Sequence, residues 1–275
     1  MYRNKTLMYA GITMLMAIGA SCSEYNKILK STDVELKYTK ALEYYNDDKC
    51  YKALPLLEEL IGLSRGTQRA EDIYYYYAKT QYCLEDYYLA NYYFKSFSKT
   101  FSNSQRAEEC LFQAAMCSFQ LSPNYTLDQT DTRNAIDEYQ LFLDQYPTSA
   151  LKDSANKMIA LLNAKIERKT FETSALYAQT QKHKAAVQAL LQFTKDYPDS
   201  KYKEEALYLM VKSQYEYAIG SIAKLQLERL RATNESYLTF AAAFPESKWL
   251  REAQTYYEKS SNEIENLLKP ALNQQ

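Results

Sequence analysis

Few side chains in this sequence are placed to do chemistry, and the first of them is a cysteine close to the start. A basic beginning is followed by an apolar run over residues 7–18 and by three small residues, and Cys22 comes next. A basic start, a short apolar core and small residues are typical of a secretory signal that is removed by cleavage. We therefore predict that residues 1–21 are a signal peptide and that the Cys22 thiol becomes available for modification.

The position of Cys22 directly after small residues resembles the cleavage box of bacterial lipoproteins, in which the cysteine becomes the acylated first residue. The aliphatic residue that usually stands three places before the cysteine is replaced here by Gly19, with Ile18 one place earlier. The alternative is an ordinary secreted protein with an incidental cysteine. We predict acylation of Cys22, attachment to a lipid bilayer, and a tether over residues 22–32.

The remaining cysteines and the one histidine form no recognisable reactive group. Cys110 and Cys117 are seven residues apart on one predicted helix, about 10 Å along its axis, which is too far for a disulfide. With Cys50 and Cys83 added, the spacings match no metal site. We expect buried free thiols, no metal and no cofactor, and we expect His183 to be a solvated turn residue.

The composition excludes several classes of function. The 33 basic and 34 acidic side chains nearly cancel, so nothing favours a nucleic-acid partner. No Gly-rich phosphate loop, HExxH or G-x-S-x-G motif is present. Adjacent acids such as Glu58 and Glu59 point about 100° apart on a helix, so they do not form a catalytic pair. The sequence therefore predicts a protein that is not an enzyme.

The informative chemistry is aromatic, because the chain holds 28 tyrosines and their positions repeat. Two rows of aromatic residues recur every 37 residues, and in each predicted helix the two members lie seven apart on one face. Tyrosine offers a large contact area and a hydroxyl group for peptide backbone. We predict a peptide-binding groove lined by both rows; the alternative is packing between helices. The rows are Tyr38, Tyr75 and Phe112, and Tyr45, Tyr82 and Phe119.

The elements that must position these rows are marked by a repeated phrase: Phe, three residues, an aromatic residue, Pro, any residue, Ser. Copies begin at Phe142, Phe193 and Phe240, and a copy at Phe97 lacks the proline. The two aromatic residues share one face of a closing helix, and the proline ends that helix. The serine can accept from the free N–H groups of the next helix. Each copy therefore predicts a helix end, a turn and a helix start.

Small residues set the period of the predicted helix pairs. Ala41, Ala78 and Ala115 are spaced by 37 residues, and a second alanine follows the first two after twelve. This is the tetratricopeptide pattern. We predict an all-α protein, a right-handed α-solenoid of about five tetratricopeptide-like helix pairs plus a C-terminal capping helix, over residues 33–270. Its N-terminal half covers about 33–148 and its C-terminal half about 149–270.

Three further expectations concern the course of the chain. Residues 121–132 lengthen the third pair and predict an exposed loop with a possible function. The long helical stretch over 150–181 is expected to break near Lys169. No domain boundary is expected within the solenoid.

Four segments carry a specific resemblance. They are Cys-Ser-x-Tyr-Asn-Lys-Ile-Leu-Lys-Ser at 22–31, Lys-Ala-x-x-Leu-Leu-Glu-Glu-Leu at 52–60, Leu-Asp-Gln-x-Asp-Thr at 127–132 and Phe-Pro-Glu-Ser-Lys at 244–248. With them the chain resembles the BamD family, the lipoproteins of the outer-membrane β-barrel assembly machinery, in its Bacteroidetes form. The resemblance covers essentially all of the chain after the signal peptide.

The resemblance implies a non-catalytic lipoprotein at the periplasmic face of the outer membrane. Its partners would be the barrel-assembly protein, held by its periplasmic domains, and unfolded outer-membrane β-barrel proteins. The N-terminal repeats would take the aromatic-ended targeting strand of the substrate, and the C-terminal repeats would dock the barrel-assembly protein. The family's docking contacts match no single residues here. The alternatives are a repeat lipoprotein that coordinates cell-wall synthesis with envelope constriction, a cell-wall hydrolase, and a glycan-binding lipoprotein.

Overall fold

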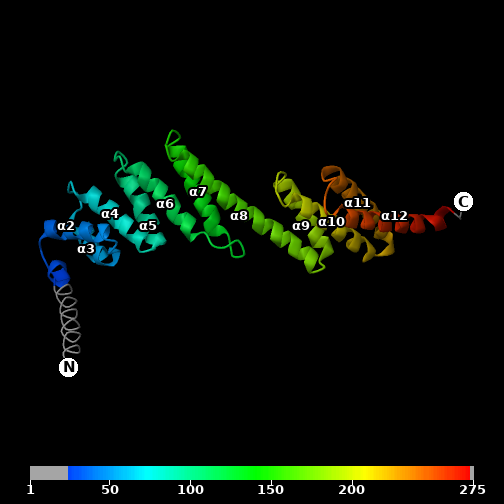
Figure 1. Cartoon of the computed structure of the whole chain (residues 1–275), viewed down its shortest axis with the longest axis horizontal. Coiled ribbons are helices and arrows are strands. Elements are labelled where there is room, and N and C mark those ends of the chain that lie inside the picture. Colours follow the sequence, from blue (N-terminus) through cyan, green and yellow to red (C-terminus); the bar gives the residue numbers. More distant parts are fainter. Residues whose placement is uncertain (1–23, 273–275) are drawn as a thin grey trace, which may run out of the picture. The chain divides into compact units, whose positions relative to one another are not determined.

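The computed structural model describes residues 24–272, with side chains as far as Lys269, and within this range the chain is helical and contains no strand (Figure 1). The predicted all-α class is thus confirmed. A short helix covers residues 24–29. The helices that follow are α2 (Val34–Asn46), α3 (Cys50–Leu63), α4 (Ala70–Cys83), α5 (Tyr87–Thr100), α6 (Ala107–Leu121), α7 (Thr130–Gln145), α8 (Lys152–Gln179), α9 (His183–Asp196), α10 (Lys203–Ile219), α11 (Ala223–Ala243) and α12 (Leu250–Leu272).

The chain forms two compact units, which differs from the expectation of no internal boundary. The first unit ends at Leu162 and the second begins at Asn163, so the division falls inside α8. Helix α8 does not break near Lys169. The Thr170 hydroxyl instead donates to the Ile166 carbonyl oxygen at 3.0 Å, a side-chain bond that a helix tolerates.

Within each unit, consecutive helices pack against each other, from α2 to α7 in the first and from α9 to α12 in the second. The first helices of neighbouring pairs also touch, as α2 and α4 do. Ala41 and Ala53, the small residues twelve apart, are fully buried, and so are Ala78 and Ala90. Because alanine lets helix backbones approach closely, these contacts confirm the tetratricopeptide-like arrangement.

The repeated phrase forms a helix end, a turn and a helix start as predicted, but its serine does not cap the helix. Ser200 accepts from the Tyr202 N–H at 3.0 Å, and Tyr202 is the residue before α10, so the bond closes the turn and reaches no N–H of the helix itself. Its own hydroxyl donates to Glu167 at 2.5 Å, on the first helix of the preceding pair. In the first unit Ser104 likewise donates to Glu71, at 2.6 Å. The serine therefore joins the start of one repeat to the body of the previous one.

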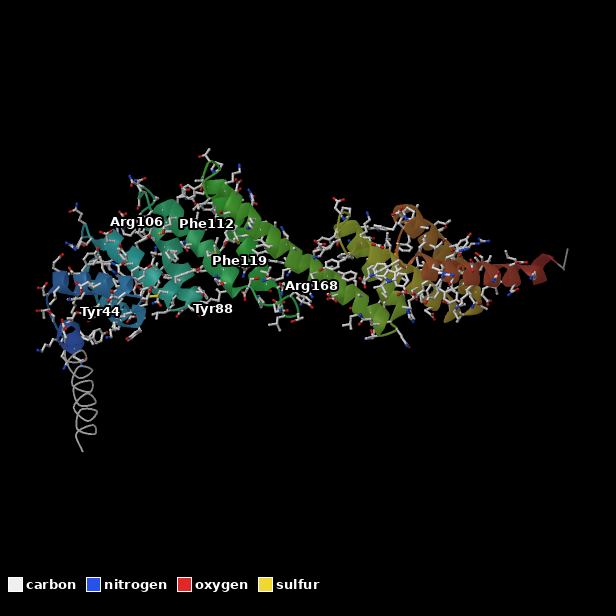
Figure 2. All side chains as sticks on the ribbon, viewed as in Figure 1. Tyr44, Tyr88, Arg106, Phe112, Phe119 and Arg168 are labelled. Carbon is white, nitrogen blue, oxygen red and sulfur yellow. A yellow bond between two sulfur atoms is a disulfide. The ribbon has the colours of Figure 1, made fainter. Side chains whose placement is uncertain are left out.

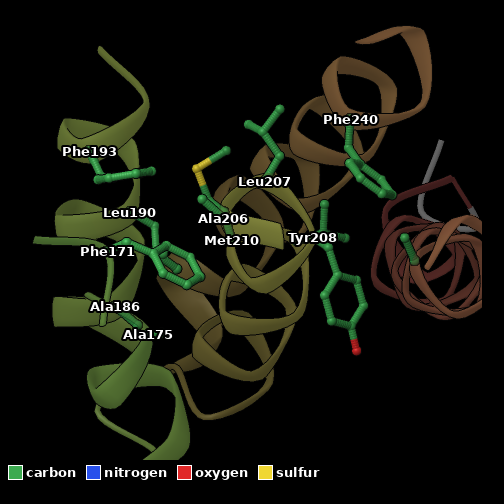
Figure 3. Packing of buried hydrophobic residues seen from close by; sticks show 12 residues of the cluster. Phe171, Ala175, Ala186, Leu190, Phe193, Ala206, Leu207, Tyr208, Met210 and Phe240 are labelled. Carbon is green, nitrogen blue, oxygen red and sulfur yellow. The ribbon is translucent and has the colours of Figure 1, made fainter. Parts of the chain in front are cut away.

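The phenylalanine that begins each phrase lies at the centre of a core. Phe142 in the first unit and Phe193 in the second are fully buried. Figure 3 shows Phe193 on α9 beside Phe171 of α8 and opposite Met210 of α10. Each core thus closes around the end of one helix pair and the start of the next.

Two of the four described cysteines are not free, which corrects the expectation of buried thiols throughout. Cys50 and Cys83 form a disulfide, with their Cα atoms 6.3 Å apart. The first residue of α3 and the last residue of α4 meet because the two helices are packed neighbours. Cys110 and Cys117 are free and buried as expected, and burial raises the pKa of each thiol to about 12. A disulfide of this kind is typical of an oxidising compartment.

The segment expected to be a tether is largely folded. Residues 24–29 are helical, and Ile28 is only 5% exposed against the core of the first helix pair. The predicted signal peptide over 1–21 and the acylated Cys22 lie outside the described residues.

Candidate peptide-binding site

The first predicted row of aromatic residues is mostly closed. Tyr75 on α4 and Phe112 on α6 are 8% and 7% exposed, and Tyr38 on α2 is half-buried. The Arg69 guanidinium lies 4.8 Å from the Tyr38 ring centroid, and the Arg106 guanidinium lies 4.6 Å from that of Tyr75. Each arginine comes directly before the first helix of the next pair. This row therefore packs one repeat on the next.

The hydroxyl group of Tyr75 is already occupied. It donates to Glu109 on α6 at 2.8 Å and accepts from Lys79 at 3.3 Å. Burial and the hydrogen bond to Glu109 raise the pKa of Tyr75, so the ring is neutral and fixed. A peptide backbone therefore finds no free hydroxyl here.

The residues that close the first row repeat in the same 37-residue register, and sequence reasoning missed them. Arg69 pairs with Glu35 at 2.9 Å, and Arg106 pairs with Asp72 at 2.5 Å. Glu35 and Asp72 are 37 apart, as are the two arginines. Applying the alanine period to charged residues, and not only to aromatic ones, would have found both pairs.

The second row keeps part of each ring exposed. Tyr45, Tyr82 and Phe119 are all half-buried, one on each of α2, α4 and α6. Tyr45 meets Tyr76 edge-on at 5.6 Å, and Tyr82 meets Tyr87 at 5.4 Å. The rings are held by neighbours without being enclosed, a combination that leaves contact area for a ligand.

Figure 2 labels a member of each row on α6. Phe112 and Phe119 lie at separate positions along this helix. The Phe112 ring packs on Phe142 at 5.3 Å, inside the core of the first unit. Phe119 is partly buried and packs against that core without being enclosed in it. The structure thus divides the six predicted residues into a packing row and a partly open row.

Hydrogen bonds within the predicted exposed loop hold part of it in place. Leu127 is 59% exposed, but Gln129 is 1% exposed and donates to the Asn124 and Leu127 carbonyl oxygens, both at 2.9 Å. Next to the loop, a cavity of about 440 Å³ opens among α5, α6 and α7 and is mainly polar in its lining. On its wall Asn91 donates to Glu138 at 2.7 Å, so polar side chains that line this cavity are hydrogen-bonded to one another.

The chemistry around the one histidine is sparse. His183 begins α9 and is half-buried, and its Nδ1 is buried without a hydrogen-bond partner, which differs from the expected solvated position. Among residues 24–272, no three His, Cys, Asp or Glu side chains are grouped as metal ligands would be. No helix in the same range combines the length and the apolar character needed to cross a membrane.

Comparison with known proteins shows which family the chain belongs to. Residues 30–230 match the YfiO family, described as an outer membrane lipoprotein. The chain is also similar to the outer membrane protein assembly factor BamD of Haemophilus influenzae, at 23% identity over 226 residues that cover 76% of this chain and 85% of the relative. The family match covers well over half of the sequence and contains both rows of aromatic residues. The chain therefore belongs to the YfiO family of outer membrane lipoproteins.

Proposed function

We propose that this protein is a non-catalytic lipoprotein that helps to assemble β-barrel proteins in the outer membrane, held at the periplasmic face by an acylated Cys22. The observation that carries the proposal is the family match over residues 30–230. The role of the Haemophilus relative as an outer membrane protein assembly factor agrees with it. Paired helices that present half-buried aromatic rings also suit binding better than catalysis.

Within this function, the partly open row receives the substrate. Tyr45, Tyr82 and Phe119 offer ring faces to an extended strand that ends in an aromatic residue. The closed row, with its arginines, holds the repeats at the spacing that the open row needs. An aromatic side chain entering between such rings gains contact area without ordering a long flexible side chain.

The second unit is the proposed docking site for the periplasmic domains of the barrel-assembly protein. Large apolar side chains are exposed on this unit, among them Ile222 at 67% and Leu238 at 57%. Scattered exposed leucines are ordinary on a protein surface, so the assignment rests on the family resemblance and on the division of the chain into two units.

Co-purification from detergent-solubilised outer membranes tests the function. The barrel-assembly protein is the expected partner of the wild-type chain. Recovery of cell-wall synthases in its place would favour the alternative role, in which the lipoprotein coordinates cell-wall synthesis with envelope constriction.

Peptide binding tests the site. With a synthetic barrel strand ending in an aromatic residue, Tyr82→Ala should weaken binding by about 2 kcal/mol, roughly 30-fold, as loss of a central aromatic contact does. Tyr88→Ala is the matched control, because Tyr88 is 67% exposed on α5 and belongs to neither row. Unchanged affinity in both Tyr45→Ala and Tyr82→Ala would show that the row only packs. Tyr75→Ala should instead lower stability, because this ring is buried and hydrogen-bonded.

A further inference from the structure

The helix at the start of the described chain is docked on the first helix pair. The Tyr25 hydroxyl donates to the Lys52 carbonyl oxygen at 3.3 Å, and the Tyr25 ring meets Tyr44 edge-on at 5.7 Å. Ile28 is buried against the core that α2 and α3 share. One side of this short helix is therefore held by a hydrogen bond, a ring contact and an apolar contact.

Docking creates a cluster of three tyrosines around one lysine, which we call the anchor-side cluster: Tyr25, Tyr44, Tyr51 and Lys52. The Lys52 ammonium lies 5.7, 5.6 and 5.8 Å from the ring centroids of Tyr25, Tyr44 and Tyr51. Tyr51 is 64% exposed at the first turn of α3, while Tyr25 and Tyr44 are half-buried. Figure 2 labels Tyr44 on this part of the first unit.

The covalent distance from this cluster to the proposed lipid is short. Only two residue steps join Cys22 to Glu24, where the docked helix begins. Two extended residues span at most about 7 Å. The headgroup layer on each side of a bilayer is about 5–7.5 Å thick, half of the difference between a core of about 30 Å and a total of about 40–45 Å. Acyl chains on Cys22 must lie in the hydrocarbon core, so the start of the helix must lie in or next to the headgroups.

We propose that the anchor-side cluster is a membrane-contact surface whose partner is the headgroup layer of a phospholipid bilayer. Tyrosine rings concentrate at this layer because they present an apolar body and a polar hydroxyl. A lysine beside them keeps its stem among the rings and directs its ammonium toward lipid phosphates. The docked helix makes this contact directional, since only Cys22 and Ser23 precede it in the acylated chain. This inference rests on the acylation of Cys22 proposed above.

Site-specific photo-crosslinking in phospholipid vesicles tests the contact. The full-length acylated chain would carry p-benzoylphenylalanine at position 51 or, as the control, at position 63. Tyr51 and Leu63 are 64% and 57% exposed and lie on the same helix. They are about 18 Å apart along its axis, at about 1.5 Å per residue. Position 51 should crosslink to headgroup-labelled phospholipid several-fold more than position 63, and equal crosslinking would overturn the inference.

Flotation and mass measurements separate this inference from the proposed function. A chain that lacks the lipid mass and does not float with vesicles would overturn the acylation of Cys22, and the membrane contact with it. A chain that floats but crosslinks equally at both positions would overturn the contact alone.

Undocking the helix tests its directing role. Tyr25→Ala combined with Ile28→Ala and Leu29→Ala removes the hydrogen bond, the ring contact and both apolar contacts of residues 24–29 but leaves the acyl anchor in place. The variant should still float, whereas crosslinking at position 51 should fall to the level at position 63. Crosslinking that persists at position 51 would contradict an orientation set by the docked helix. Circular dichroism of the variant checks that the remaining helices are intact.

Discussion

The two units cover the same aromatic position of the repeat in different ways. In the first, the ring of Tyr75 is covered by the Arg106 guanidinium at 4.6 Å, which also pairs with Asp72. In the second, the ring of Tyr208 is stacked by Trp249, with centroids 5.4 Å apart and planes 8° from parallel. Both coverings come from the residue just before a helix, Arg106 before α6 and Trp249 before the last helix, α12. The same repeat geometry thus uses either charge or aromatic stacking.

One further interface in each unit follows the same division, whereas the residue before α8 in the first unit is the apolar Leu151, which packs against the core that contains Phe112. Tyr38 lies under Arg69 in the first unit, and Phe171 stacks on Tyr202 at 4.7 Å in the second. Guanidinium groups stay partly hydrated and need a carboxylate partner, whereas stacked rings exclude water. Two interfaces of the first unit, which carries the open row of aromatic residues, are therefore covered by groups that depend on charge. The two corresponding interfaces of the second unit are covered by stacked rings.

The largest expected effect is the loss of stability when a core phenylalanine is replaced, and it tests whether the two units have independent cores. Phe142→Ala in the first unit and Phe193→Ala in the second should each cost about 3–5 kcal/mol, because each leaves a cavity around a fully buried ring. Hydrogen exchange should show lost protection in the mutated unit and little change in the other. Leu141→Ala and Leu191→Ala are matched controls, since these neighbours are 50% and 41% exposed. Equal losses across both units would mean that they unfold as one.

The disulfide should contribute an intermediate amount to the free energy of unfolding, and only in the first unit. Cys50 and Cys83 close a loop of sequence separation 33. The chain-entropy relation assigns about 3–4 kcal/mol to a loop of this length. Cys83→Ser should lower the urea midpoint of the first unit, and a reductant should do the same to the wild-type chain. The second unit holds no cysteine and serves as the internal control. A midpoint that reduction leaves unchanged would show that the helix pair is stable without the bond.

Much of the fold could be predicted because its signals are local and periodic. The alanines at 41 and 78 mark where two helices cross, and the serine at 200 marks a helix that starts three residues later, at Lys203. The Cys50–Cys83 bond could not be predicted in this way, since it depends on which helix ends become neighbours in space. The boundary between the two units leaves no mark in the sequence either, because α8 continues through it without a break.

The sequence predicted which residues of the candidate site share a repeat position, but it did not predict which of them are exposed. The 37-residue period placed Tyr75 and Tyr82 on one face of α4. It could not show that Tyr75 is covered, because the covering residue, Arg106, lies 31 positions downstream and belongs to the next repeat. Exposure of a repeat position is decided by the neighbouring repeat, so periodicity alone assigns a face and not its accessibility.

The smallest expected effect tests the two coverings directly. Trp249→Ala should cost about 2 kcal/mol, through lost stacking and apolar burial, and most of this loss should persist at high salt. Arg106→Ala should cost about 1 kcal/mol or less at low salt, since the side chain is 36% exposed, and the loss should shrink as salt screens its ion pair. Urea unfolding at low and high ionic strength measures both.

Two controls sharpen this comparison. Arg106→Lys keeps the charge but loses the flat guanidinium over Tyr75, so part of the loss should remain at every salt concentration. Lys248 lies over the Trp249 ring at 4.1 Å, and Lys248→Ala measures how much of the tryptophan effect comes from that cation. If Trp249→Ala were as sensitive to salt as Arg106→Ala, the stack would owe its stability to Lys248, and the two coverings would rest on the same physical interaction.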